Sequence, residues 1–173
     1  MGEIEAFTEE KLVIGVLVSR KGLLNPLKEK LVEEFGVIDY ESPIFLFDFS
    51  HYYDREMGTP IYRLFYSFRD LVDTSLLWRI KVITNKIEEE FVVDGGRKIN
   101  LDPGLMALSR FVLASTKENS HRIPLNNGIY AEITLMFERG SFRPVEWTYP
   151  DYKSDRYIEI LGKIRGIYKR QIG

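Results

Sequence analysis

The sequence contains no cysteine and, among its 173 residues, only two histidines, His51 and His121. The absence of cysteine excludes disulfides, thiolate nucleophiles and cysteine-ligated zinc or iron–sulfur sites. Two imidazoles are too few for a histidine-rich metal site. Asp48, Glu56 and Asp102 could supply carboxylates to a mixed site, but neither histidine lies in an H-E-x-x-H or H-x-E motif. We therefore expect no bound metal.

An excess of positive charge and a long apolar run are also missing. Lysine and arginine total 24 against 26 aspartates and glutamates, a formal net charge of −2, whereas a general nucleic-acid binder normally carries a basic excess or stripe. No apolar run approaches the roughly 20 residues that span a bilayer, and the acidic start MGEIEAFTEE does not resemble a signal peptide. We expect a cytoplasmic, soluble protein that binds neither membranes nor nucleic acids in general.

The composition fits one globular domain. Hydrophobic residues make up 45% of the chain and aromatic residues 13%, and a chain of this length buries roughly 70% of its unfolded surface. We find no repeat, no low-complexity stretch and no linker rich in proline, glycine or serine. The sequence thus predicts a flexible segment over residues 1–10 and a single domain over residues 11–173.

Short apolar or alternating runs predict the strands. They are KLVIGVLVS (11–19), SPIFLFDF (42–49), PIYRLFYSF (60–68) and KINL (98–101). SPIFLFDF is apolar on both faces, which is typical of a central strand. Residues 120–147 are expected to form a three-strand meander with turns at 126–128 and 139–141, because Asn-Asn-Gly and Arg-Gly-Ser favour tight turns.

Capping signals and apolar periodicity predict helices at 25–35, 73–92, 102–115 and 154–170. In the first, Asn25 would be the N-cap, Pro26 the first helical residue and Gly36 the stop; Asp102 and Pro103 repeat this start in the third. The expected buried stripes are Leu27, Leu31 and Phe35; Leu76, Ile80, Ile83, Ile87 and Phe91; and, after the cap Ser154, Tyr157, Leu161, Ile164 and Tyr168.

The order of these elements predicts an α+β fold in a single domain. Its start, β-α-β-β-α-β, matches the split-βαβ, ferredoxin-like pattern. The helix at 102–115, the meander and the C-terminal helix would extend that start. We expect the strands to form one mixed sheet and the helices to pack against it.

Four strings of the sequence resemble those of a known family. They are YESPIFLFDFSHYYDREMG, KINLDPG, SHRIPLNNGIYAEITL and WTYPDY, and the resemblance runs from about Lys11 to Gln171. The family consists of uncharacterised prokaryotic proteins catalogued as a domain of unknown function, some of whose members carry an automatic GTP-binding label. The resemblance implies no established catalytic residues.

Two polar segments carry the candidate site residues. FDFSHYYDREMG (47–58) presents Asp48 and His51 at the end of an expected strand, and STKENSHR (115–122) gathers Lys117, His121 and Arg122. Lysine and arginine suit a phosphate or carboxylate. We predict that these residues and Asn100 line one cleft; otherwise both segments are loops that hydrogen-bond to their own turns. In WTYPDY (147–152), we expect the aromatic rings to anchor a chain crossing.

Function stays open between two main hypotheses. The first is binding of a small anionic ligand, phosphorylated or nucleotide-like, through Asn100, Lys117 and Arg122. The second is a hydrolase or phosphoesterase in which His51 or His121 acts as a general acid or base beside Asp48. An interaction module within a larger assembly is a third reading. The sequence specifies neither a cofactor nor an oligomeric state.

The GTP-binding label leads to a prediction, because the chain lacks a P-loop. The motif G-x-x-x-x-G-K-[ST] is absent, and the single Gly-Lys pair, Gly162-Lys163, precedes Ile164. TNKIE (84–88) differs from the guanine-reading N-K-x-D by a glutamate, and we interpret it as flanking a buried helix stripe. We expect no Mg²⁺-dependent stabilisation by GTP in a thermal-shift assay; a guanine-specific shift abolished by EDTA would contradict this.

Overall fold

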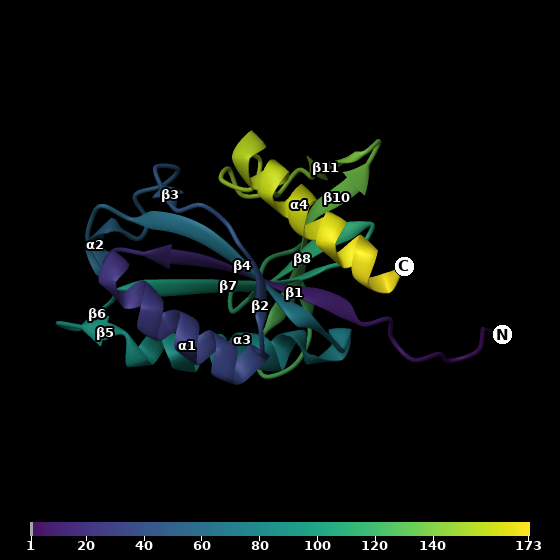
Figure 1. Ribbon diagram of the computed structural model, residues 1–173, viewed down its shortest axis with the longest axis horizontal. Helices are drawn as coiled ribbons and strands as arrows, with labels where there is room; N and C mark the ends of the chain where they lie inside the picture. Colours follow the sequence, from purple (N-terminus) through teal and green to yellow (C-terminus); the bar gives the residue numbers. More distant parts are fainter. Residues whose placement is uncertain (1) are drawn as a thin grey trace.

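A computed structural model describes residues 2–173 as one sheet covered by helices on both faces (Figure 1). The strands of the sheet are β1 (Glu10–Val18), β2 (Ile38–Glu41), β3 (Phe45–Leu46), β4 (Tyr62–Val72), β7 (Ile99–Met106), β8 (Arg110–Ser115), β9 (Ile123–Pro124), β10 (Tyr130–Glu138) and β11 (Ser141–Pro144). β5 (Val92–Val93) and β6 (Gly96–Arg97) form a separate hairpin. The helices are α1 (Leu24–Phe35), α2 (Asp54–Met57), α3 (Leu77–Glu90) and α4 (Asp155–Ile172), with 3-10 turns η1 (Lys21–Leu23) and η2 (Thr74–Leu76).

The strand order is β11-β10-β8-β7-β1-β4-β2, with β3 beside β4 and β9 beside β10. The predicted α+β class is confirmed. The elements β1, α1, β2, β4, α3 and β7 have the order β-α-β-β-α-β, but β2 precedes the expected strand at 42–49, and β3 and α2 lie between β2 and β4. Among the described residues, every strand pair is antiparallel, so the sheet is not the mixed one expected. No helix in this part of the chain is both long and apolar enough to cross a membrane.

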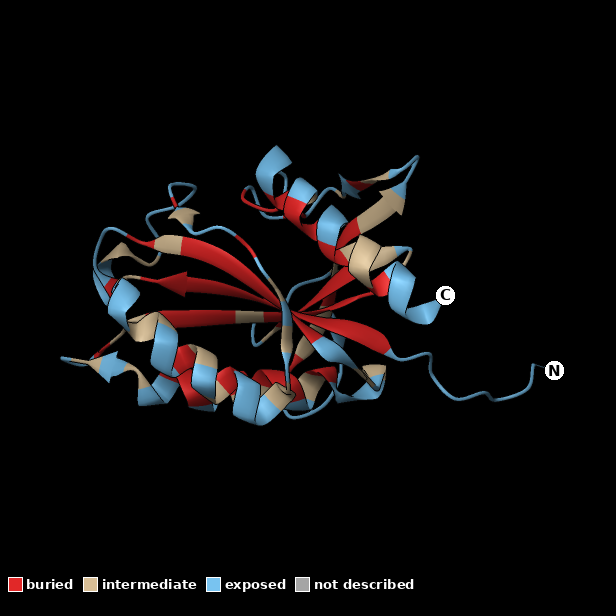
Figure 2. Ribbon diagram, viewed as in Figure 1, coloured by how far each residue is buried: buried red, intermediate tan, exposed pale blue. Residues whose placement is uncertain are grey.

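β1 lies at the centre of the core, and its nine residues are all buried (Figure 2). Leu12, Ile14 and Val16 face α1 and α3. Val13 faces α4 on the other side, in a cluster rich in aromatic rings. Each such aliphatic side chain contributes about 1.5–3 kcal/mol when it leaves water. β1 therefore joins two cores that lie on opposite faces of one sheet.

The C-terminal helix and the meander follow the sequence prediction. The Ser154 hydroxyl accepts a hydrogen bond from the Tyr157 amide at the start of α4, and the expected stripe of this helix is buried. Both meander turns contain backbone in the left-handed region, at Asn127 and Gly128 and at Arg139 and Gly140. Such turns match the twist of the strands they join.

The start of α1 differs from the prediction. The N-cap is Leu23, without a side-chain hydrogen bond, because the 3-10 turn η1 leads directly into the helix. Asn25 therefore lies in the first turn and is not the cap. Gly36 ends the helix as expected, with φ of 85°. This conformation favours glycine because a Cβ would clash there.

The expected central strand at 42–49 is wrong, because this segment runs along the edge of β4. The Ser42 hydroxyl accepts a hydrogen bond from the Phe65 amide, but Pro43 follows and lacks an amide proton. Only Phe45–Leu46 pairs as a strand, and Phe47 joins a small separate cluster of buried side chains. The apolar run thus covers a local core beside the sheet.

The expected helix at 102–115 is also wrong, because β7 and β8 form a hairpin there. β7 pairs with β1 along its whole length, from Ile99 to Met106, and this pairing overrides the local helix-start signal of Asp102 and Pro103. The hairpin turns at 107–110, where the Ala107 amide donates to the Arg110 carbonyl at 3.0 Å.

α3 is rotated relative to its predicted stripe. Leu76 lies in the turn before the helix and is 39% exposed, whereas Ile80 and Ile87 are buried as expected. Next to these apolar residues, the helix also buries Lys81, Thr84 and Glu88. TNKIE therefore does not simply flank the stripe, because two of its polar residues lie in the interior.

Gly104 provides a test of the β7–β8 hairpin. A Cβ at this position would lie 2.6 Å from the Val112 carbonyl oxygen and 2.7 Å from the Phe111 ring. We expect Gly104→Ala to lower the free energy of unfolding by about 1–3 kcal/mol in urea denaturation, because the strands must move apart. The control Gly162→Ala lies in an open position of α4 and should raise stability by about 0.5–1 kcal/mol. Equal effects of the two variants would contradict the hairpin.

Candidate functional site

The site begins where β8 separates from β7. β8 pairs only with Gly104–Met106, so the preceding part of β7 has no strand on that side. There the Leu101 amide donates to Glu88 Oε1 at 2.7 Å, and the Leu101 carbonyl accepts from Lys81 Nζ at 2.9 Å. Pro103, two residues on, faces the same edge and has no amide proton. Side chains of α3 thus take the place of a neighbouring strand.

A cavity of about 760 Å³ occupies this gap. Its walls come from α3, β7, β8 and β10, from the loop of residues 47–53 and from the segment 149–152. A volume of this size holds a small organic ligand.

The floor of the cavity contains a buried arginine on β4. The Arg63 guanidinium, 2% exposed, donates to Asp102 at 2.9 Å, to Asp151 at 3.2 Å and to the Tyr157 hydroxyl at 2.8 Å. Gly15 of β1 leaves room for it, because a Cβ there would lie 2.9 Å from Arg63 Nη1. Burial raises the pKa of the Asp151 carboxyl, and the positive charge of Arg63 opposes this shift.

A second arginine continues the network along β7. Arg97 contacts Glu88 at 2.7 Å and Glu56 at 2.6 Å, and it reaches the Asn100 side-chain oxygen at 3.3 Å. The Asn100 amide group in turn donates to Asp102 at 2.9 Å. Burial raises the pKa of Glu88, whereas the hydrogen bond from Arg97 lowers the pKa of Glu56. One chain of polar contacts therefore runs along this wall.

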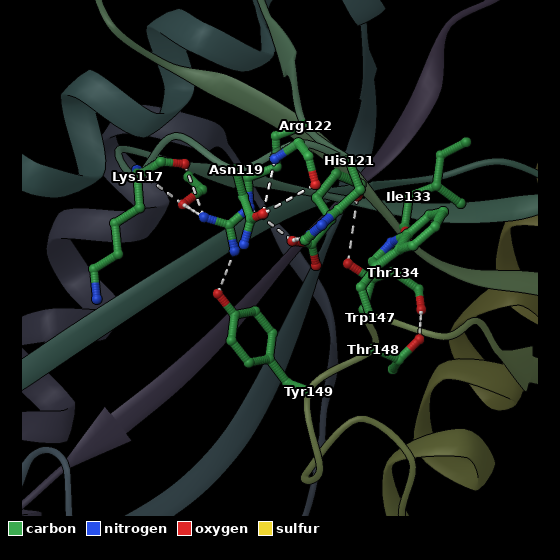
Figure 3. A network of polar contacts seen from close by, with 12 residues as sticks. Lys117, Asn119, His121, Arg122, Ile133, Thr134, Trp147, Thr148 and Tyr149 are labelled. Atoms are coloured by element: carbon green, nitrogen blue, oxygen red, sulfur yellow. Dashed lines mark hydrogen bonds and ion pairs between the residues drawn. The ribbon is translucent and has the colours of Figure 1, made fainter.

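Another part of the lining is organised around the ion pair of Arg122 with Glu132. Figure 3 shows Arg122, His121 and Tyr149 in this network. Arg122 Nε donates to Glu132 Oε2 at 2.7 Å, and its Nη2 donates to the Tyr149 hydroxyl at 2.5 Å. His121 Nε2 lies 2.8 Å from the same glutamate oxygen. The His121 ring stacks on Trp147 with ring centroids 4.9 Å apart. These contacts hold the 115–122 loop against β10 and the segment 147–152.

The structure places the predicted site residues in two groups. Asn100, Lys117 and Arg122 line the cavity together, whereas Asp48, His51 and His121 are not part of its lining. His51 pairs with Asp54 at 2.7 Å, and its side chain is 98% exposed. His121 lies behind Glu132. The two histidines therefore do not meet at one wall.

The sequence reasoning missed seven charged residues of the lining, which are Arg63, Lys81, Glu88, Glu89, Arg97, Glu132 and Asp151. A signal exists for some of them. Lys81, Thr84 and Glu88 follow the i, i+3, i+7 spacing of a single helix face, and Arg63 and Glu132 are isolated charges within apolar strands.

Several polar groups of the lining have hydrogen-bonding capacity left. In residues 2–173, the buried side-chain polar atoms without a partner are Ser19 Oγ, Glu132 Oε1 and the Tyr152 hydroxyl, and the last two residues line the cavity. Lys81 Nζ bonds to the Leu101 carbonyl and forms no ion pair within the described chain. This part of the chain holds no group of three or more metal-binding side chains.

Arg63 allows a test of the buried network. We expect Arg63→Met to lower the free energy of unfolding by about 3–5 kcal/mol at neutral pH, because Asp102 and Asp151 lose their cation. The control Arg69→Met, on the same strand but 62% exposed, should change it little. Urea denaturation measures both.

The loss in Arg63→Met should depend on pH. Without Arg63, the already raised pKa of Asp151 rises further above its value in the unfolded chain. A raised carboxyl pKa contributes stability at low pH that is lost as the pH rises through the folded-state value. The deficit relative to wild type should therefore be smaller near pH 4 than at pH 7. A deficit that grows on acidification would contradict this assignment.

Comparison with known sequences identifies the family. The profile of the family described as Domain of unknown function (DUF4416) matches residues 8–168. Searches of curated proteins and of solved structures gave no significant match. Because the family match covers nearly the whole chain, including every segment that lines the cavity, the protein belongs to the DUF4416 family.

Proposed function

We propose that the cavity binds a small anionic ligand, phosphorylated and nucleotide-like. The observation that carries this proposal is Lys81. The residue is 8% exposed and belongs to the cavity lining, and of its three N–H donors one meets the Leu101 carbonyl. Burial raises the pKa of nearby Glu88 and the positive charge of Lys81 opposes this shift, but Glu88 forms its ion pair with Arg97. A buried cation without a direct ion pair is costly, and a phosphate in the cavity would supply that ion pair.

Lys117 provides a second cation at the entrance. Its ammonium group donates to the Tyr52 hydroxyl at 2.9 Å, and its side chain extends away from the Arg122 network (Figure 3). By contrast, Arg63, Arg97 and Arg122 each have a carboxylate partner. The two lysines are therefore the cations of the lining that remain available to an anion.

Aromatic rings favour a ligand with a flat, apolar part. Phe49, Tyr52 and Tyr149 line the cavity and are 39%, 65% and 43% exposed. Such rings stack with nucleobases, at about 1–3 kcal/mol per base. A compact anion such as phosphate would leave them unused. The combination of two lysines and three rings supports a nucleotide-like ligand.

A hydrolase or phosphoesterase is the second candidate. It is favoured by the His121–Glu132 pair, with Nε2 and Oε2 2.8 Å apart, because Glu132 reaches the cavity. A histidine held by a carboxylate is a common general acid or base. The predicted partners His51 and Asp48 would act at an exposed position outside the lining. Incubation with a nucleotide that binds, followed by product analysis, separates the two candidates. Turnover by the wild type that is abolished in His121→Asn favours the enzyme.

The Lys81 proposal leads to a binding prediction. In a calorimetric screen of nucleoside monophosphates and triphosphates, we expect at least one to bind the wild type. Lys81→Met should weaken that binding tenfold or more, because a charge-assisted hydrogen bond contributes about 1.5–3 kcal/mol. Lys86→Met, an exposed position of the same helix outside the lining, should leave the affinity unchanged.

Two results would contradict the proposal. One is the absence of binding by every nucleotide in the screen. The other is an equal loss of affinity in Lys81→Met and Lys86→Met, because general attraction by net charge would then explain the binding. Circular dichroism at the calorimetry temperature establishes that Lys81→Met is folded.

A further inference from the structure

Glu132 has one occupied and one open carboxylate oxygen. The residue is the third of β10 and is 1% exposed. Its Oε2 accepts hydrogen bonds from Arg122 Nε at 2.7 Å and His121 Nε2 at 2.8 Å. Two donors on one oxygen fix the orientation of the group. Its Oε1 is buried and has no partner in residues 2–173, and the residue belongs to the lining of the cavity.

A purely structural role accounts for only half of this arrangement. Holding Arg122, and through it the 115–122 loop, requires Oε2 alone. A buried acceptor that lacks a donor costs about 1–3 kcal/mol. The hydroxyl of Tyr152, another residue of the lining, is unpartnered as well. Two residues of the cavity lining thus each carry a buried polar atom without a partner.

The chemistry of Oε1 restricts what can meet it. A carboxylate oxygen only accepts hydrogen bonds, so its partner has to be an N–H or O–H group. A compact anion would instead place negative charge beside it, which is repulsive at short range. The complementary ligand therefore keeps its anionic group, suited to Lys81, apart from a neutral donor, suited to Glu132.

We propose that Glu132 is the specificity-determining residue of the cavity, and that its Oε1 accepts a hydrogen bond from the sugar hydroxyl or base N–H of a nucleoside phosphate. This inference rests on the proposed function and names the feature of the ligand that selects it. Arg122 and His121 act as positioning residues, because they hold the other oxygen. The phosphate group itself binds to Lys81 and Lys117.

Glu132→Gln tests this role with little change in shape. The side-chain amide can keep its oxygen toward Arg122 and His121, and its NH₂ group then points into the cavity, which converts an acceptor into a donor. Glu89→Gln is the matched control. Glu89 also lines the cavity from α3 and is exposed, so the substitution removes the same charge without touching Oε1.

The probes for calorimetry are AMP, GMP, CMP, UMP, ribose 5-phosphate and inorganic pyrophosphate. We expect at least one donor-bearing phosphate to bind the wild type more tightly than pyrophosphate. Glu132→Gln should lower that affinity tenfold or more and should leave the affinity for pyrophosphate within threefold. Glu89→Gln should leave both affinities within threefold. Urea denaturation establishes that both variants are folded.

The outcomes separate this inference from the proposed function. If no probe binds the wild type, the proposed function fails and this inference fails with it. If anions bind, but Glu132→Gln leaves every affinity within twofold, only the specificity role of Glu132 is overturned. The same conclusion holds if Glu89→Gln has an equal effect, or if pyrophosphate binds as tightly as every donor-bearing probe.

Discussion

The backbone of Leu101 has to be hydrogen-bonded in a place where the sheet offers it no strand. Buried amide and carbonyl groups are almost always paired, and β8 has already turned away from β7 at this point. Lys81 and Glu88 therefore extend from α3 to bond the Leu101 carbonyl and amide. This requirement places charges on the inner face of a helix. It also keeps the two strands apart, which leaves the space for the cavity.

The remaining charges of that wall follow from this constraint. Glu88 cannot remain buried without a cation, and Arg97 supplies one from the β5–β6 hairpin. Arg97 reaches Asn100, and Asn100 reaches Asp102 beside Arg63. The desolvation cost of each buried charge is offset by the hydrogen bond or ion pair that it forms with the next group of the network. This wall of the cavity is therefore polar, and its charged side chains are held by one another.

Capping and turn signals predicted an element correctly where its packing in the fold agrees with its local sequence. They failed where pairing with a distant strand determines the conformation. The C-terminal helix combines a serine cap with a regular stripe, and the Asn127-Gly128 turn requires left-handed backbone, so both were correct. Asp102 and Pro103 carry an equally good helix signal, but β1 pairs with them as a strand. Among the residues that line the cavity, Lys117 and Arg122 were predicted because they lie in a polar loop. Lys81, on a helix that also buries apolar residues, was overlooked.

Some of the overlooked residues share a property that sequence reasoning can use. Arg63 and Glu132 are single charges in strands whose other inward-facing positions are mostly apolar. An apolar side chain at either position would avoid the desolvation cost and is often neutral or stabilising. Local violations of the apolar pattern tend to mark functional sites. Here Arg63 is fully compensated, whereas one carboxylate oxygen of Glu132, a residue of the cavity lining, has no partner in residues 2–173. In the function that we propose, that difference separates a charge that supports the site from one that contacts the ligand.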